Sequence, residues 1–254
     1  MFANERQNEI YRMILRDGAV TTTKLVELFC VSVETIRRDL LFMEHSRKLK
    51  RVHGGAVVLG EMKNFPTLEL RNLEMNEEKR ELTVVAAECV NEGDHIGIDS
   101  GSTAILFAEA LKEKFSSLTV ITYSSDVFEI LRNHADFKVI LCGGNYVKEE
   151  NAFCGPLTLA MIELLHIKKM FLCPSAVSMK YGICDYQQDL FMLQKAMLKI
   201  SDEIYVMADS SKFEGRALLK IDDMRSDYFY ITDGKLSNEL KEIYSENNIK
   251  IISK

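Results

Sequence analysis

The chain has 254 residues, 47% of them hydrophobic and 28% charged, which suits a globular protein of one or two domains with a sizeable core. No apolar run approaches the ~20 residues of a membrane-spanning helix, and the N-terminus MFANERQNEI is too polar for a signal peptide, so we expect a cytoplasmic protein. The net charge of −6 argues, at first, against a nucleic-acid partner.

The charges are distributed unevenly along the chain. Residues 1–60 carry ten Lys/Arg against seven Asp/Glu, a net charge of +3, so residues 61–254 carry −9. This asymmetry suggests a small module that faces a polyanion, joined to an acidic body with another task.

Cysteine and histidine give no sign of metal chemistry. The six cysteines form no Cys-x-x-Cys pair and lie mostly in apolar segments, and the five histidines have no ligand-like spacing. We expect reduced, buried thiols, no metal and no cofactor.

Three short helices are expected at the N-terminus. The first spans Asn4–Arg16, and Thr21–Thr23 offers an N-cap for a second that ends near Phe29. After a tight connection, Ser32 caps a third helix. Its apolar residues step by three and four and predict a core-facing stripe of Val33, Ile36, Leu40 and Met43.

A basic hairpin is expected to follow the third helix. Residues 48–58 contain two short apolar runs around Gly54-Gly55, a pair typical of hairpin turns. Three helices with a short turn before the last, followed by such a hairpin, predict a winged helix-turn-helix at residues 1–60.

The third helix is the candidate reader of DNA. Arg37 and Arg38 face outward and can donate to guanine O6 and N7 or clamp a phosphate, while Ser32 at the helix N-terminus favours a phosphate. The alternative is a solvated surface on which the arginines pair with Asp39 or Glu34. The candidate DNA-binding residues are Thr22, Ser32, Glu34, Thr35, Arg37, Arg38, Lys50, Arg51 and His53.

Residues 61–72 have a weak pattern that includes Pro66, and we assign them to a linker. In the effector domain, 73–254, short apolar runs alternate with helical stretches, which predicts a mostly parallel α/β sheet covered on both faces. The expected strands are His95–Asp99, Leu118–Thr122, Lys138–Leu141, Lys169–Cys173, Glu203–Ala208, Tyr228–Thr232 and Asn248–Ile252, with helices near 77–91, 102–114, 125–134, 156–165, 187–200 and 236–246.

The segment Ile96–Thr103, IGIDSGST, passes from a strand through a glycine loop to the start of a helix. Backbone N–H groups, three hydroxyls and the helix dipole converge there on a volume that suits a phosphate. It is shorter than a Walker loop and lacks its lysine, which argues against a nucleoside triphosphate. A simple glycine turn with a Ser/Thr N-cap is the alternative.

Other loops follow strand ends, where ligands bind in open α/β sheets. Lys212 suits a phosphate, and Asp99 and Asp209 suit sugar hydroxyls, although each aspartate is as readily a structural cap. Lys79 lies on the first helix of the domain, where a solvated lysine is more usual. The candidate effector-binding residues are Lys79, Asp99, Ser100, Gly101, Ser102, Thr103, Ser124, Gly143, Gly144, Asp209 and Lys212.

The N-terminal motifs resemble those of the DeoR family of bacterial transcriptional regulators. The resemblance rests on Glu5-Arg6, on SVETIRRDL at 32–40 and on KRVHGGAV at 50–57. One departure is Ser46-Arg47-Lys48, where the family usually has a glycine before the wing. The resemblance implies a sequence-specific DNA-binding protein, and a repressor of a sugar-metabolism operon in particular.

The rest of the chain is also similar to this family. EEKRELTVVAAECVNEGDHIGIDSGST, LCGGNY, ADSSKF and SDYFYITD look like its C-terminal domain, whose fold is similar to ribose-5-phosphate isomerase and which binds a phosphorylated sugar or sugar-like metabolite. By that resemblance, 100–103 hold the phosphate, and 143–144 and Lys212 line the pocket. A second departure is the segment 173–182, where Pro174 removes a backbone donor from a stretch that is usually glycine-bearing.

An isomerase-like enzyme tethered to DNA is the alternative function. Isomerisation needs a positioned base and an electrophile, and no acid/base set stands out from the spacing, so a metabolite sensor is favoured. Because one winged helix reads few base pairs, we expect a homo-oligomer, dimer or tetramer, held by the C-terminal domains.

Overall fold

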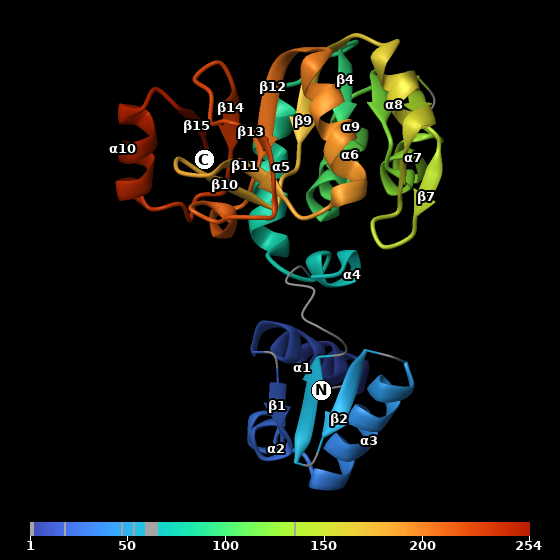
Figure 1. Ribbon diagram of the computed structural model, residues 1–254, viewed down its shortest axis with the longest axis vertical. Helices are drawn as coiled ribbons and strands as arrows, with labels where there is room; N and C mark the ends of the chain where they lie inside the picture. Colours follow the sequence, from blue (N-terminus) through green and yellow to red (C-terminus); the bar gives the residue numbers. More distant parts are fainter. Residues whose placement is uncertain (1–2, 18, 47, 53, 59–65, 135) are drawn as a thin grey trace. The chain divides into compact units, whose positions relative to one another are not determined.

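The computed structural model describes two compact units, Met1–Pro66 and Thr67–Lys254 (Figure 1). The described residues are 3–17, 19–46, 48–52, 54–58, 66–134 and 136–254. The second unit begins earlier than the expected 73, because residues 68–71 form a helix whose Leu68 and Leu70 are buried.

The first unit has three helices and a small antiparallel sheet. Its strands lie in the order β1-β3-β2. In chain order the elements are α1 (Ala3–Asp17), β1 (Ala19–Thr21), α2 (Thr22–Phe29), α3 (Val33–His45), β2 (Leu49–Val52) and β3 (Gly55–Val58). This is the expected winged helix-turn-helix, with β1 as an additional strand.

The helix starts are those that the sequence predicts. Thr21 accepts a hydrogen bond from the backbone N of Lys24 at 3.3 Å, and Ser32 accepts one from the backbone N of Thr35 at 3.1 Å. These caps satisfy N–H groups that a helix leaves unpaired at its first turn.

The core of the first unit is formed by all three helices and the sheet. Ile36, Leu40 and Met43 of α3 are buried, as expected, together with residues of α1 such as Ile10 and Ile14. Val33 is 45% exposed, so its assignment to the core stripe was wrong. It is the first residue of α3 and lies beyond the helices that cover the rest of the stripe.

The two wing glycines have different roles. Gly54 has a φ of +83°, which glycine adopts without steric cost. A Cβ on Gly55 would lie 2.0 Å from the carbonyl oxygen of Val20, so β1 and β3 pack too closely there for any side chain.

The second unit is built on a parallel sheet of seven strands in the order β15-β14-β12-β9-β4-β5-β6. All seven were predicted, with boundaries shifted by a few residues. The strands are β4 (His95–Ile98), β5 (Thr119–Thr122), β6 (Lys138–Leu141), β9 (Ile167–Leu172), β12 (Ser201–Met207), β14 (Phe229–Ile231) and β15 (Lys250–Ile252).

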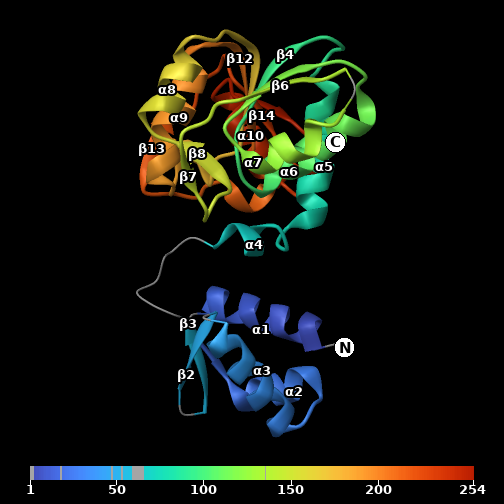
Figure 2. The same cartoon turned by 90° about the vertical axis from the view of Figure 1, so that its right-hand side faces the viewer.

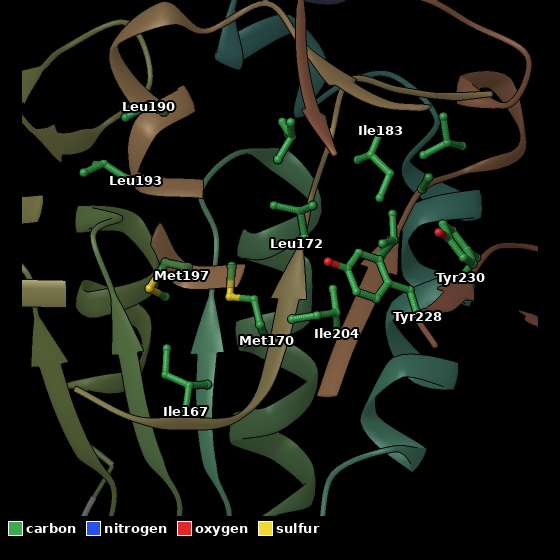
Figure 3. Close-up of a cluster of buried hydrophobic side chains, with 14 of the residues drawn as sticks. Ile167, Met170, Leu172, Ile183, Leu190, Leu193, Met197, Ile204, Tyr228 and Tyr230 are labelled. Atoms are coloured by element: carbon green, nitrogen blue, oxygen red, sulfur yellow. The ribbon is translucent and has the colours of Figure 1, made fainter. Parts of the chain in front are cut away.

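Helices cover both faces of this sheet (Figure 2). One face packs against α5 (Asn76–Glu88), α6 (Ser102–Lys114) and α7 (Ser125–Leu131). The other packs against α8 (Pro156–Glu163), α9 (Gln188–Lys199) and α10 (Asn238–Glu246). Figure 3 shows part of the second core, where Met197 of α9 lies beside Met170 of β9.

Several short elements were not predicted. They are the helix α4 (Leu68–Arg71), the 3-10 turn η1 (Ser210–Lys212) and five strands: β7 (Asn145–Val147), β8 (Ala152–Cys154), β10 (Ala176–Ser178), β11 (Gly182–Asp185) and β13 (Leu219–Asp222). The strands form two small antiparallel sheets, β7-β8 and β10-β11-β13. The segment 173–182, which departs from the family pattern, contains β10 and so contributes to the sheet β10-β11-β13.

The chain crosses from one half of the large sheet to the other between two central strands. It runs outward from β4 through β5 to β6, then returns to β9 beside β4 and runs outward through β12 and β14 to β15. Ligands of open α/β sheets bind at such a switch point, outside the carboxyl ends of the strands. A ligand is therefore expected at the loops after β4 and β9.

Candidate functional site

The outward face of α3 presents the predicted cations. Arg37 and Arg38 are exposed, and Thr35 is half-buried. The guanidinium of Arg37 lies 3.9 Å from the carboxylate of Glu34, with both side chains about two-thirds exposed. Such a pair contributes little free energy, so Arg37 can exchange Glu34 for another anion.

Asp39 does not pair with the outward arginines. It is buried, and Arg6 of α1 donates to its carboxylate at 2.6 Å, with Gln7 donating to the other oxygen at 2.8 Å. Asp39, one of the two carboxylates that could pair with Arg37 and Arg38, therefore binds Arg6 and Gln7 in the core between α1 and α3.

The polar groups at the start of α3 contact one another. The hydroxyls of Ser32 and Thr35 lie 2.9 Å apart, beside the Ser32 cap. Thr22 is half-buried at the start of α2. These groups stand at helix N-termini, where backbone N–H groups and the dipole favour a phosphate.

The wing carries exposed Lys50 and Arg51. The backbone N of Arg51 donates to Glu44 at 2.8 Å, which ties β2 to α3. Lys48 lies with its ammonium 5.7 Å from the centre of the Tyr11 ring. His53 and Arg47 both lie outside the described residues. Ser46, which precedes Arg47, follows the end of α3, and its hydroxyl donates to the carbonyl of Phe42.

At the switch point of the second unit, Gly101, Ser102 and Thr103 open α6. Gly101 occupies the N-cap with a φ of +97° and has no side chain to cap the helix. The hydroxyl of Thr103 is buried and has no hydrogen-bond partner within the described part of the chain. A buried hydroxyl without a partner costs free energy, and here it lies at a helix N-terminus that favours an anion.

Asp99, in the loop after β4, is an acceptor at the centre of a buried network. It accepts from the Tyr123 hydroxyl, from the backbone N of Ser100 at 2.8 Å and from the backbone N of Cys173 at 3.0 Å. Gln194 of α9 donates to it at 3.3 Å. Burial raises the pKa of Asp99. Its bonds join the loops after β4, β5 and β9, which favours a structural role over contact with a ligand.

Lys79 and Lys212 contribute positive charge at the same edge. Lys79 is 4% exposed rather than solvated, and its ammonium donates to the carbonyls of Arg71 and Glu74 at 2.5 and 2.8 Å. Burial, together with the nearby charge of Lys212, lowers the pKa of Lys79 to about 8. Lys212 donates to the carbonyl of Pro174 at 2.9 Å, so the departing proline supplies an acceptor.

Asp209 acts as a local cap and also balances this charge. It accepts from the backbone N of Ser211 at 3.2 Å, and its carboxylate lies 4.0 Å from the ammonium of Lys212.

Three other predicted ligand residues have close neighbours within the protein. Ser124 caps α7 by accepting from the backbone N of Val127 at 3.3 Å. The carbonyl of Gly143 accepts from the Thr158 hydroxyl at 3.1 Å. A Cβ on Gly144 would lie 2.1 Å from that same hydroxyl.

Sequence reasoning missed five polar residues at this edge. Arg71 of α4 binds Glu150, and Gln187 donates to the same carboxylate. Gln194 donates to Asp185 at 2.7 Å. Only Gln194 had a sequence signal, as a polar residue on the apolar face of α9 between Leu193 and Met197.

The cysteines and the acidic groups show no metal centre. All six cysteines are free, and the one at position 30 is exposed, contrary to the expectation of burial. Among the described residues, no group of three or more His, Cys, Asp or Glu side chains could hold a metal ion. None of the described helices is long and apolar enough to cross a membrane.

Comparison with known proteins covers both units. The model of a DeoR-like helix-turn-helix domain matches residues 6–61, and that of a DeoR C terminal sensor domain matches residues 74–234. Among solved structures, ribose 5 phosphate isomerase A from Neisseria gonorrhoeae is similar at a TM-score of 0.40 and 21% identity, over 54% of this chain and 53% of that chain.

Two curated relatives match over nearly their full lengths. The uncharacterized HTH-type transcriptional regulator YulB of Bacillus subtilis (strain 168) is 32% identical over 99% of this chain and 96% of its own. The glycerol-3-phosphate regulon repressor of Escherichia coli (strain K12) is 27% identical over 99% of both chains. Both are named as regulators of transcription, which decides against the enzyme alternative. With its winged helix-turn-helix and its sensor domain, this chain belongs to the DeoR family of DNA-binding transcriptional regulators.

Proposed function

We propose that the protein represses a sugar-metabolism operon and that a phosphorylated sugar or sugar-like metabolite, bound at the switch point of the second unit, relieves the repression. The observation that carries this proposal is the buried Thr103 hydroxyl without a partner, in the first turn of a helix that Gly101 leaves uncapped. A phosphate oxygen at this helix N-terminus would accept from Thr103 and from free backbone N–H groups.

Nearby cations support a dianionic ligand. Lys212 lies close enough for its charge to help lower the pKa of Lys79, so the edge has positive charge to neutralise. A phosphate monoester carries a charge between −1.5 and −2 at neutral pH. Asp209, beside Lys212, is suited to accept from a sugar hydroxyl. One relative is named for a regulon of glycerol 3-phosphate, which is itself a phosphate monoester.

For DNA, we assign base contacts to Arg37 and Arg38 on α3, and phosphate contacts to Ser32, Thr35, Lys50 and Arg51. The exposure of both arginines and the weak Glu34 pair support this assignment. Thr22 at the start of α2 would contact the backbone of the adjacent strand of the duplex.

We also propose that the protein acts as a homo-oligomer held by its second units. Leu157 and Leu164 of the α8 region are 73% and 86% exposed, and Met161 between them is 38% exposed. Spacings of three and four place them on one face, opposite buried Ile162. Since a helix that is apolar on both faces is usually buried, a second copy of this surface is its natural cover.

Ligand binding can move the DNA equilibrium only through a difference in affinity between two arrangements. A coupling of roughly 1–3 kcal/mol would change operator affinity ~5–150-fold. The protein would work in the cytoplasm, the compartment that holds a bacterial chromosome.

The test is a melting-temperature screen of the full-length protein with phosphorylated sugars. We expect a rise in Tm with the cognate phosphate and its loss in a Ser102→Ala, Thr103→Ala double variant. A Ser116→Ala, Ser117→Ala double variant is the control, because these serines lie beyond the C-terminal end of α6. An equal rise with the unphosphorylated sugar would overturn the phosphate site.

A further inference from the structure

Arg71 and Glu150 form a buried ion pair that neither the sequence motifs nor the phosphate site explains. One guanidinium nitrogen of Arg71 lies 2.5 Å from both carboxylate oxygens of Glu150, and Gln187 donates to the same carboxylate. The Glu150 side chain is 3% exposed and that of Arg71 is 16% exposed. Burial raises the pKa of Glu150, which favours the neutral acid. Arg71 and these hydrogen bonds are what stabilise the ionised carboxylate against this effect.

The same guanidinium lies against the proposed phosphate loop. A Cβ on Gly101 would lie 3.2 Å from the second terminal nitrogen of Arg71. Arg71 therefore stands beside the uncapped N-terminus of α6, where it could meet a phosphate. At present its other terminal nitrogen is occupied by a carboxylate of the protein.

Arg71 also belongs to the first element of the second unit. It ends α4, which begins one residue after Thr67, where this unit starts, and Leu68 and Leu70 anchor the helix. Its carbonyl accepts from buried Lys79 of α5. Figure 1 shows α4 beside the start of α5. What holds Arg71 thus also holds α4, the first element of the second unit.

We propose that Glu150 is an internal competitor for the ligand: a phosphate monoester bound at Ser100–Thr103 takes Arg71 from Glu150, and α4 changes its position as a result. This inference rests on the proposed phosphate site and adds Arg71 as a ligand-binding residue. Arginine binds phosphate in a bidentate, charge-assisted manner at least as well as carboxylate. Because α4 has different partners with and without ligand, it supplies the two arrangements that regulation requires.

The experiment follows phosphate binding and backbone hydrogen exchange in the full-length protein, with inorganic phosphate as the probe and chloride at equal ionic strength as the reference. In the parent protein, phosphate should slow exchange in residues 99–105 and change it in residues 67–75. Glu150→Gln keeps the shape of the side chain but weakens its hold on Arg71. It should bind phosphate on the order of tenfold more tightly, a factor typical of one charged hydrogen bond.

Arg71→Gln should bind phosphate at least tenfold more weakly and lose the response of residues 67–75. Two exposed neighbours provide matched controls: Glu149→Gln for the carboxylate and Arg80→Gln for the cation, both with parental behaviour. Unchanged exchange in β4 and β9 verifies that each variant is folded.

The outcomes distinguish the competitor role of Glu150 from the phosphate site itself. If phosphate protects residues 99–105 but Glu150→Gln binds it no better than the parent, the competitor role of Glu150 is wrong and the phosphate site stands. If the parent shows no protection at 99–105, the phosphate site and this inference both fall.

Discussion

Arg37 and Asp39 lie two residues apart on α3 and have opposite surroundings. Arg37 is exposed beside Glu34, and Asp39 is buried against Arg6 and Gln7. The buried pair fixes α3 against α1, because removal of either partner would leave an uncompensated charge in the core. The exposed arginines remain available for DNA.

At the residue scale, Arg37→Ala and Arg38→Ala should each weaken operator binding by roughly 1–3 kcal/mol, the range expected for a bidentate base contact. Tm should stay at the parental value, since both side chains are exposed. Fluorescence anisotropy with a DNA fragment selected by the parent protein measures the loss. Arg132→Ala, at an exposed arginine that follows the end of α7, is the control. Parental affinity in both variants would remove the recognition-helix assignment.

Lys79 predicts a pH dependence of ligand binding. Its pKa of about 8 means that it is charged below pH 8 and increasingly neutral above. A bound phosphate favours the charged form, so binding above pH 8 must take up a proton, and affinity should fall from pH 8 to pH 9. A phosphate monoester, with a second pKa of about 6, does not itself titrate there.

Isothermal titration across this range tests the sign of the effect. Lys79→Gln should bind more weakly at pH 7.5 and show no such fall. An equal fall in the parent and in Lys79→Gln would assign the titration to another group.

At the scale of elements, α4 and α8 differ in what covers them. The apolar residues of α4 are buried within the second unit, whereas α8 presents Leu157, Met161 and Leu164 to solvent. Since Ile162 on the opposite face of α8 is buried in the core that α8 shares with α9, the outer face of α8 is surplus to the fold of one chain.

Leu157→Glu together with Leu164→Glu should dissociate the oligomer, with at least a tenfold rise in its dissociation constant, because each copy would bury two unpaired charges. Analytical ultracentrifugation gives the mass. Leu218→Glu is the matched control, since Leu218 is 66% exposed outside α8. A double variant with the parental mass would place the interface elsewhere.

At the scale of the whole molecule, charge is divided between the two tasks. The first 60 residues carry a net +3 and the remainder −9. The acidic body repels DNA, so binding must depend on a few cations of the first unit and should weaken as salt screens them.

Lys50→Ala and Arg51→Ala should each reduce the slope of log affinity against log salt by about 0.9, the value for one phosphate contact. Affinity measured between 50 and 300 mM salt gives the slope. Lys148→Ala, an exposed lysine of the acidic body, should leave it unchanged. The parental slope in both wing variants would exclude wing contacts with phosphate.

The sequence alone determined the three N-terminal helices, the wing hairpin, and the seven strands of the large sheet with the helices between them. Strands buried on both faces appear as continuous apolar runs, and caps such as Ser32 act within one turn of helix, so both are local signals. The loop at 99–103 was visible for the same reason, since strand, glycine turn and helix start follow one another directly. The strands β7, β8 and β10 were missed because none of them lies in an apolar run of four residues, as β14 does in Tyr228–Ile231.

Only the tertiary structure decided which side chains meet. Arg71 and Glu150 are 79 residues apart, and Gln194 reaches Asp99 across 95 residues. These contacts depend on the order of strands in the sheet, which places β9 beside β4, and local patterns carry no information about that order. The same packing buried Lys79 and left Val33 exposed, because burial depends on what neighbouring elements cover.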